Sequence, residues 1–232
     1  MHVCCFGYKH KLTMTNKKYK TILFDLDGTL IDSKPGILTA IRKTLNEFKI
    51  PYTEEVINQM VGPPFRISMK ELLGIEDMSL IEQLIFVYRT HYKGGDWKGC
   101  SIYDGVEDML TALRGAGYTL GLATSKPLQY TTIIMESLGL DKYFDYVGGA
   151  TGDATAEMKT DVINVVLSKL NVTDLDSVLM IGDRLYDVEG AKQSGVDSIG
   201  ILWGYGDRVE HENCGADYIL STPSEVVNFL VK

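Results

Sequence analysis

Three short apolar segments of this sequence each end in residues that can do polar chemistry. The polar residues that follow these segments are Asp25 and Asp27, Thr124 and Ser125, and Asp183. The carboxyl ends of parallel strands meet at one edge of a sheet, and ligands bind there, near the point where the strand order reverses. The sequence therefore predicts that side chains from distant segments meet in a single crevice.

Carboxylates dominate this predicted crevice. The acids expected there are Asp25, Asp27, Asp183 and Asp187. Two like charges about 4 Å apart cost roughly 4 kcal/mol at an effective dielectric constant near 20, so such a group needs a cation. The ligands are oxygens and no His or Cys lies nearby, which favours a hard ion, Mg²⁺ first. The four acids are therefore candidate ligands of a magnesium cofactor.

Asp25 and Asp27 are expected to play different roles. Asp25, whose ordinary pKa is about 3.9, is ionised at neutral pH and can attack phosphorus as a nucleophile. Four carboxylates, one Mg²⁺ and the ammonium of Lys159 leave a formal charge of -1. Since that charge would oppose a phosphate dianion, we expect one acid to be protonated. Asp27 is the candidate, because it could protonate the leaving alcohol and then activate water.

The segments around these residues predict a doubly wound α/β core. Strands are expected over 19–25, 119–123, 144–147, 177–181, 198–201 and 218–220, and helices over 104–116, 128–138, 159–170, 188–193 and from 223 onward. Strands that alternate with helices of this length indicate a parallel sheet covered on both faces.

Between Pro35 and Cys100 the pattern is helical only. Apolar residues recur at helical spacing over 35–48, 65–73 and 80–92. Ser33 is a plausible N-cap for the first of these helices, with Pro35 in its first turn. We expect a core of residues 19–34 and 103–232, interrupted after its first strand by an all-α cap domain of residues 35–102.

The same residues resemble the motifs of a known family. Asp25-Leu-Asp-Gly-Thr-Leu-Ile-Asp-Ser33 resembles the first motif of the haloacid dehalogenase superfamily, and Thr124 resembles the second. Lys159, which lies 24 positions before Asp183, is similar to the third motif, and Gly182-Asp183-Arg-Leu-Tyr-Asp187 resembles the fourth. The helical insert sits where one branch of the superfamily carries a mobile cap. Within that branch the chain looks most like the phosphoglycolate phosphatase group.

The resemblance implies a role for each matched acid. Asp25 becomes the aspartyl-phosphate nucleophile and a metal ligand. Asp27 becomes the general acid and base, and its backbone carbonyl also binds the metal. Asp183 ligates Mg²⁺, and Asp187 acts directly or through water. Alternatively, Asp187 could have only a structural role, as an acid at a helix N-terminus that the helix dipole stabilises.

The resemblance also assigns the phosphate-binding groups. Thr124, with the amide of Ser125, would hold the phosphoryl oxygens, and Lys159 would neutralise the nucleophile and the phosphate. Two alternatives stay open. Thr124 and Ser125 could cap a helix, and Lys159 could be a solvated lysine while Lys126 supplies the charge.

The insert supplies the candidate substrate residues. A cap loop must close over the crevice, and an arginine suits an anionic substrate group, so Arg66 and Gly62 are candidates together with Lys126. Alternatively, Gly62 to Arg66 only connects two cap helices. Hinges are expected near Asp32–Lys34 and Ser101–Asp104. Arg184 is a departure from the fourth motif, where a smaller residue is commoner, and could point to solvent or pair with Asp187.

These expectations converge on a phosphoric monoester hydrolase that acts on a small phosphorylated metabolite, phosphoglycolate first. A 5′-nucleotidase, a pyrophosphatase or a phosphomutase would use the same core residues. A dehalogenase is disfavoured, because its chemistry needs no acid two residues beyond the nucleophile. A non-catalytic regulatory protein would be expected to lack one of the acids or the lysine. Gly204-Tyr-Gly206 lacks the third glycine of a dinucleotide fingerprint.

Composition sets the remaining bounds. The 232 residues carry a net charge of -8, which disfavours nucleic acid and anionic membranes as partners. No apolar run approaches the roughly 20 residues of a membrane span. Four cysteines (Cys4, Cys5, Cys100 and Cys214) show no zinc or disulfide spacing, so free thiols in the cytoplasm are expected. Residues 1–18 are interpreted as a disordered leader.

Overall fold

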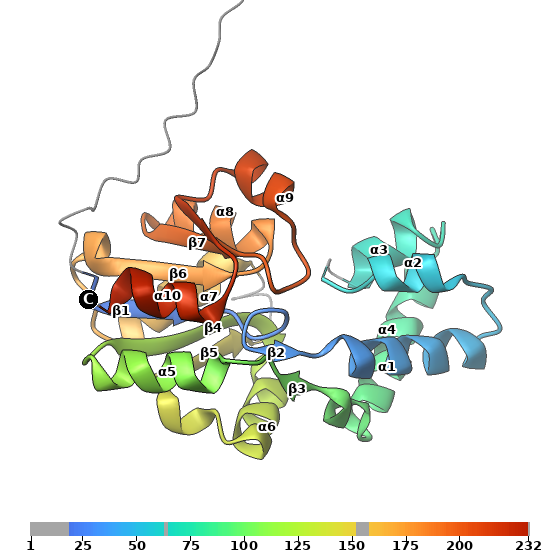
Figure 1. Ribbon diagram of the computed structural model, residues 1–232. Coiled ribbons are helices and arrows are strands. Elements are labelled where there is room, and N and C mark those ends of the chain that lie inside the picture. The colour runs from blue at the N-terminus through green and yellow to red at the C-terminus, as the bar shows by residue number, and fades with distance from the viewer. Residues whose placement is uncertain (1–18, 63–64, 152–157, 232) are drawn as a thin grey trace, which may run out of the picture.

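A parallel sheet forms the centre of the computed structural model, which describes residues 19–62, 65–151 and 158–231 (Figure 1). Within these residues the sheet has six strands in the order β5-β4-β1-β6-β7-β8. The strands are β1 (Thr21–Phe24), β4 (Thr119–Pro127), β5 (Tyr146–Ala150), β6 (Val178–Gly182), β7 (Asp197–Ile201) and β8 (Tyr218–Leu220). The strand order reverses at β1, which pairs with β4 on one side and β6 on the other.

Helices cover both faces of this sheet. On one face lie α5 (Val106–Gly115), α6 (Leu128–Leu138) and α10 (Pro223–Leu230), and on the other α7 (Lys159–Lys169) and α8 (Leu185–Ser194). The side chains of β1 alternate between the two layers, since Ile22 and Phe24 pack on the first and Leu23 on the second. A shorter helix, α9 (Arg208–Cys214), packs against α8. The predicted doubly wound α/β fold is confirmed.

A second group of helices follows the start of the chain. It contains α1 (Lys34–Glu47), α2 (Glu54–Gln59), α3 (Phe65–Glu71) and α4 (Met78–Lys93). These helices pack around their own apolar cluster, which includes Leu38, Ile41, Leu45, Ile57, Met69 and Leu84. The sequence did not predict α2, because a six-residue helix with one buried side chain is too short to show a period. The division into core and cap domains stays a prediction.

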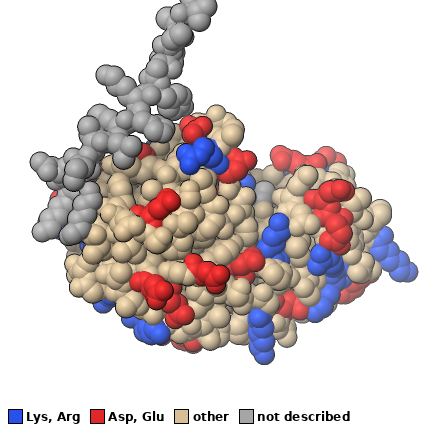
Figure 2. Space-filling model, in the orientation of Figure 1, with Lys and Arg blue, Asp and Glu red and all other residues tan. Residues whose placement is uncertain are grey.

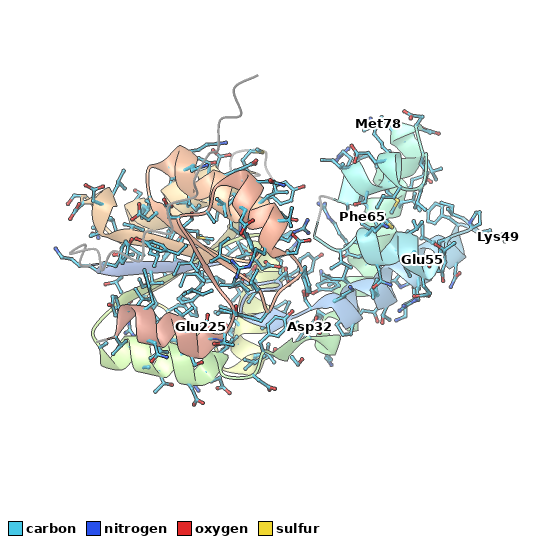
Figure 3. The ribbon with its side chains drawn as sticks, turned by 45° about the horizontal axis from the view of Figure 1, so that its top comes forward. Asp32, Lys49, Glu55, Phe65, Met78 and Glu225 are labelled. Atoms are coloured by element: carbon cyan, nitrogen blue, oxygen red, sulfur yellow. The ribbon has the colours of Figure 1, made fainter. Side chains whose placement is uncertain are left out.

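A two-stranded ribbon joins the sheet to these helices. Strand β2 (Ile31–Asp32) runs antiparallel to β3 (Ser101–Ile102), so the outgoing and returning segments lie side by side. Asp32 lies at the junction of the two groups of elements, whereas Glu55, Phe65 and Met78 lie in the helical group (Figure 3). Both strands have only two residues, which is too short for an alternating pattern, and the sequence did not predict them.

Some local expectations differ from the structure. Ser33 precedes α1, but its side chain makes no capping bond; its hydroxyl instead lies 3.2 Å from the hydroxyl of Tyr205. Strand β4 continues to Pro127, past the expected end at residue 123. The leader at residues 1–18 lies outside the described residues, as do Cys4, Cys5, Pro63 and Pro64.

The surface and the thiols complete the description. Acidic and basic side chains are interspersed on the face drawn in Figure 2. Cys100 and Cys214 are both free and half-buried. Among the described residues, every helix is too short or too polar to cross a membrane.

Candidate active site

Three carboxylates meet at the carboxyl edge of the sheet. Asp25 follows β1 and its amide donates to the carbonyl of Ile181 at 3.0 Å, so it continues the sheet ladder. Asp183 follows β6, and Asp187 lies in the first turn of α8. Oxygens of the three carboxylates lie within 4.8 Å of one another. The side chains of Asp183 and Asp187 are buried, and that of Asp25 is 12% exposed. The acids that follow β1 and β6 therefore lie together, as the positions of the strand ends predicted.

Lys159 joins two of these acids. Its ammonium lies 2.7 Å from Oδ1 of Asp25 and 2.7 Å from Oδ1 of Asp187, and it donates to the carbonyl of Ala123 at 3.0 Å. Burial alone would lower the pKa of Lys159, but the carboxylates of Asp187 and Asp25 outweigh it and raise that pKa. Because Lys159 is only 7% exposed, the alternative of a solvated lysine is wrong.

Burial and mutual repulsion disfavour the ionised forms of Asp25 and Asp183. Burial raises the pKa of Asp25 to about 6; Lys159 acts against this rise, and the charges of Asp187 and Asp27 add to it. Burial also raises the pKa of Asp183 well above its usual value, with the charges of Asp187 and Asp25 adding to the effect. Since the donors are all oxygens and repel one another, they fit a hard divalent cation, which would relieve the repulsion.

The orientation of Asp183 is fixed by two groups. The hydroxyl of Thr29 donates to its Oδ1 at 3.3 Å, and the amide of Tyr205 donates to its Oδ2 at 2.8 Å. Gly28 has φ of +83°, and any Cβ there would overlap the Asp183 carboxylate. A Cβ at Gly204 would collide with the same side chain. The backbone at positions 28 and 204 therefore packs so closely on Asp183 that only glycine fits at these two positions.

Asp187 has two partners. Its Oδ2 accepts from the amide of Arg184 at 3.0 Å, which caps the start of α8, while its Oδ1 faces Lys159. The role at a helix N-terminus and the role in the acidic cluster therefore coexist. The Arg184 side chain pairs with Glu210, at 2.9 Å from Nε to Oε1, and not with solvent or the Asp187 carboxylate as expected.

Asp27 lies apart from the other acids, against Lys126. The ammonium of Lys126 donates to both carboxylate oxygens at 3.0 Å and to the hydroxyl of Tyr92 on α4 at 2.9 Å. Both oxygens of Asp27 therefore act as acceptors. The second ammonium brings the formal charge of the four acids, Mg²⁺ and two lysines to zero. A bound phosphate dianion would make this charge negative again, so the expected protonation of one acid in the reactive complex stays a prediction.

We expect Lys126→Met to reduce kcat/KM for an alkyl ester such as ethyl phosphate by about 10- to 100-fold, because a charged hydrogen bond to Asp27 is lost and such a bond contributes roughly 1.5–3 kcal/mol. Tyr92→Phe should cost less than about tenfold, since it removes one neutral partner and keeps the ring 4.7 Å from the ammonium. Steady-state kinetics would measure both effects. Lys142→Met, which removes an exposed lysine lying over a tyrosine ring, is the matched control. If Lys126→Met lost no more activity than this control, the proposed contribution of Lys126 beside Asp27 would be contradicted.

Thr124 and Ser125 lie in the last part of β4. Thr124 is buried, and its hydroxyl accepts from the amide of Lys126 at 3.3 Å, whereas Ser125 is exposed. Helix α6 begins at Leu128 without a side-chain cap, so the alternative that these hydroxyls cap a helix is wrong. Their contact with a phosphoryl group stays a prediction.

The structure does not bring Arg66 together with the acids. Its guanidinium pairs with Glu82 on α4, and both side chains are about half exposed. Gly62 lies at the edge of the crevice, where a Cβ would overlap Nη1 of Arg184. An arginine does reach the crevice, but it comes from the core and not from the cap loop.

Tyr205 is a residue that sequence reasoning missed. Its hydroxyl accepts from the amide of Ser33 at 3.0 Å and donates to Oδ1 of Asp32 at 3.2 Å, while its own amide holds Asp183. One residue therefore touches both the acidic cluster and the ribbon. The sequence signal for Tyr205 was the pair of glycines that flank it, Gly204 and Gly206. These glycines are needed because a Cβ at either position would overlap Asp183, and they are not part of a nucleotide fingerprint.

Comparisons with known proteins agree with this geometry. The sequence model of the family described as haloacid dehalogenase-like hydrolase matches residues 22–201. The chain is 34% identical over 207 residues to the tyrosine-protein kinase PtkA of Mycobacterium tuberculosis, covering 89% of this chain and 67% of that protein. It is 30% identical to the phosphoglycolate phosphatase of Colwellia psychrerythraea, covering 92% and 98%. The structure of a haloacid dehalogenase-like hydrolase from Streptococcus pneumoniae superposes with a TM-score of 0.84 at 29% identity, covering 91% and 98%.

Proposed function

The chain belongs to the haloacid dehalogenase-like hydrolases and is a phosphoric monoester hydrolase, and we propose that it works with Mg²⁺ through an aspartyl-phosphate on Asp25. The observation that carries this proposal is the cluster of Asp25, Asp183 and Asp187, with oxygens within 4.8 Å and with Lys159 between two of them. We expect these three acids and the backbone carbonyl of Asp27 to hold the metal. The bound ion would neutralise the carboxylates so that a phosphate dianion can approach.

Asp25 is the proposed nucleophile. Lys159 donates to its Oδ1 and orients the carboxylate, and with a pKa of about 6 the group is mostly ionised at pH 7. A carboxylate oxygen attacks phosphorus, the bond to the leaving oxygen breaks, and an aspartyl-phosphate forms. The buried Thr124 and the amide of Ser125 are the proposed contacts of the phosphoryl oxygens.

Asp27 is the proposed general acid and base. In the complex with substrate Asp27 carries a proton, which it gives to the leaving alkoxide. The resulting carboxylate then takes a proton from the water that attacks phosphorus, and the bond between phosphorus and the Asp25 oxygen breaks, which restores Asp25. Its carboxylate lies beside the crevice and is about a quarter exposed, so a substrate oxygen can approach it. Lys126 holds both of its oxygens and must yield one of them to the substrate.

We expect Asp27→Asn to lower turnover of an alkyl phosphate by about 10²- to 10⁴-fold, because the alkoxide then leaves without a proton. The first step with p-nitrophenyl phosphate should survive, since p-nitrophenolate leaves unaided. Rapid-quench measurement should therefore show a burst of p-nitrophenol followed by slow release of phosphate. Equal losses for the two esters would argue against an acid role for Asp27.

The substrate proposal begins with phosphoglycolate, supported by the similarity to phosphoglycolate phosphatases. A 5′-nucleotide is the runner-up, because a 5′-nucleotidase of Pseudomonas aeruginosa is 31% identical. Phosphate release measured over about a hundred phosphorylated metabolites, with and without Mg²⁺, would separate them. A pyrophosphatase would release phosphate from pyrophosphate. A phosphomutase would isomerise a sugar phosphate without releasing phosphate.

A phosphotransferase is the second candidate, because a relative is named as a tyrosine-protein kinase. Such an enzyme would pass the γ-phosphoryl group of ATP to a tyrosine hydroxyl in place of water. Incubation with radiolabelled ATP and a tyrosine-containing polymer would detect that transfer. We also propose a cytoplasmic location, supported by the free thiols of Cys100 and Cys214.

A further inference from the structure

A cavity of about 390 Å³ lies between the core and the helical group. Its lining includes Lys34, Asn58 and Gln59 from the helical group and Arg184, Gly204 and Tyr205 from the core. Gly204 and Tyr205 also contact Asp183, so the cavity borders the carboxylate cluster. The volume is at the small end of ligand pockets, which suits a compact leaving group.

The charged residues that line the cavity are both cationic. Lys34 and Arg184 are its charged lining residues, and its described lining contains no carboxylate. Glu210 lies behind Arg184 and offsets one of the two positive charges. Asp32 also lies near this space, since its Oδ1 accepts from the amide of Lys34 and the hydroxyl of Tyr205. The two cationic side chains of the lining suit one negative group.

Arg184 has one nitrogen left for a ligand. Its Nε and Nη2 are held by Glu210 at 2.9 and 3.3 Å, and these bonds fix the guanidinium plane. Among the described residues, Nη1 has no hydrogen-bond acceptor, and it lies directly over Gly62. A guanidinium held in this way binds a carboxylate or phosphate with little further loss of side-chain freedom.

We propose that Arg184, with Lys34, binds an anionic group on the leaving-group part of the substrate. Preferred substrates are then phosphate monoesters whose small alcohol portion carries a second negative charge, such as a carboxylate. This inference rests on the proposed phosphatase function and assigns its selectivity to a core residue.

The test compares two esters of similar size, 2-phosphoglycolate, which carries a carboxylate, and ethyl phosphate, which does not. The wild-type enzyme should prefer 2-phosphoglycolate. Arg184→Gln should lower kcat/KM for 2-phosphoglycolate by roughly 10- to 100-fold and change that for ethyl phosphate by less than about threefold. Arg208→Gln, which removes an exposed arginine paired only loosely with Glu212 at 3.9 Å, is the matched control and should change neither.

Two further variants keep the test decisive if Arg184→Gln folds poorly. Arg184→Gln combined with Glu210→Gln leaves no unpaired carboxylate. Gly62→Ala keeps Arg184 but displaces Nη1, because the new Cβ would overlap it; a thermal melt confirms that each variant is folded. Both should lose the preference for 2-phosphoglycolate.

The possible results distinguish failure of the proposed role of Arg184 from failure of the proposed phosphatase function. Equal losses for the two esters, or an unchanged preference in every variant, would overturn the role of Arg184 while Mg²⁺-dependent hydrolysis stands. Hydrolysis of neither ester by the wild-type enzyme, with or without Mg²⁺, would instead overturn the proposed function. Loss of the preference only in the Arg184 and Gly62 variants supports the inference.

Discussion

Asp25→Asn is expected to lower hydrolysis of p-nitrophenyl phosphate by at least about 10⁴-fold, as removal of a covalent nucleophile does in other enzymes. An amide oxygen is a poor nucleophile, and no aspartyl-phosphate can form on it. The substitution is nearly isosteric, so the fold should persist. The p-nitrophenyl ester is the right probe because its leaving group needs no proton, which isolates the nucleophile from the acid.

Two measurements check this expectation. Steady-state phosphate release gives the size of the loss, and acid quenching with labelled substrate reports the phosphoenzyme, which should be present in the wild-type protein and absent in the variant. Asp108→Asn changes an exposed acid on α5 and is the matched control. Comparable activity in the wild type and Asp25→Asn would remove the basis for covalent catalysis.

Asp183→Asn should have two opposite effects. The side chain is fully buried beside Asp25 and Asp187, so its negative charge is destabilising in the metal-free protein. The neutral amide removes this buried charge and should therefore raise the free energy of unfolding at pH 7. The same change should lower Mg²⁺-dependent hydrolysis by at least about 10²-fold, because a charged ligand is lost.

The pH dependence gives a second check on this variant. Folding raises the pKa of Asp183 and raises that of Asp25 to about 6, so the folded state binds more protons than the unfolded state. The contribution of these groups to stability is therefore greatest below about pH 4 and falls as the pH rises through about 6. The gain from Asp183→Asn should shrink as the pH is lowered from 7 to 5, because Asp25, with a pKa of about 6, takes up a proton over this range and the repulsion within the wild-type cluster falls.

Urea unfolding in EDTA and in Mg²⁺ would measure these changes. Mg²⁺ should stabilise the wild-type protein by binding its folded state, and should stabilise Asp183→Asn far less. Asp108→Asn should follow the wild type under both conditions. A variant that is less stable than the wild type in EDTA at pH 7 would show that the carboxylates do not repel one another as described.

The sequence predicted the sheet and the meeting of its strand ends well. Apolar strands such as β1 and β6 are fully buried, so their hydrophobic runs are visible without a structure. Parallel strands then bring Asp25 and Asp183 to one edge by geometry alone. Lys159 was expected in the crevice and also matches the third motif of the family, but nothing in its local pattern sets it apart from a solvated lysine.

Contacts between loops were beyond sequence reasoning. The pairing of Lys126 with Asp27 and Tyr92 joins three segments, and no periodicity records it. Arg66 was expected to face the crevice because of its charge, yet Glu82 on the neighbouring helix is its partner. Which of several arginines reaches a site depends on how the helices pack, and local pattern does not contain that information.

The glycines that flank Tyr205 have a consequence for how this chain can change. At position 204 any Cβ would run into the carbonyl of Gly28 and the Asp183 side chain, and at position 206 into the carbonyl of Asp183. Neither residue has a side-chain functional group, yet any larger side chain at either position would push on Asp183. A saturation mutagenesis scan should therefore find almost no tolerated replacement at these two sites.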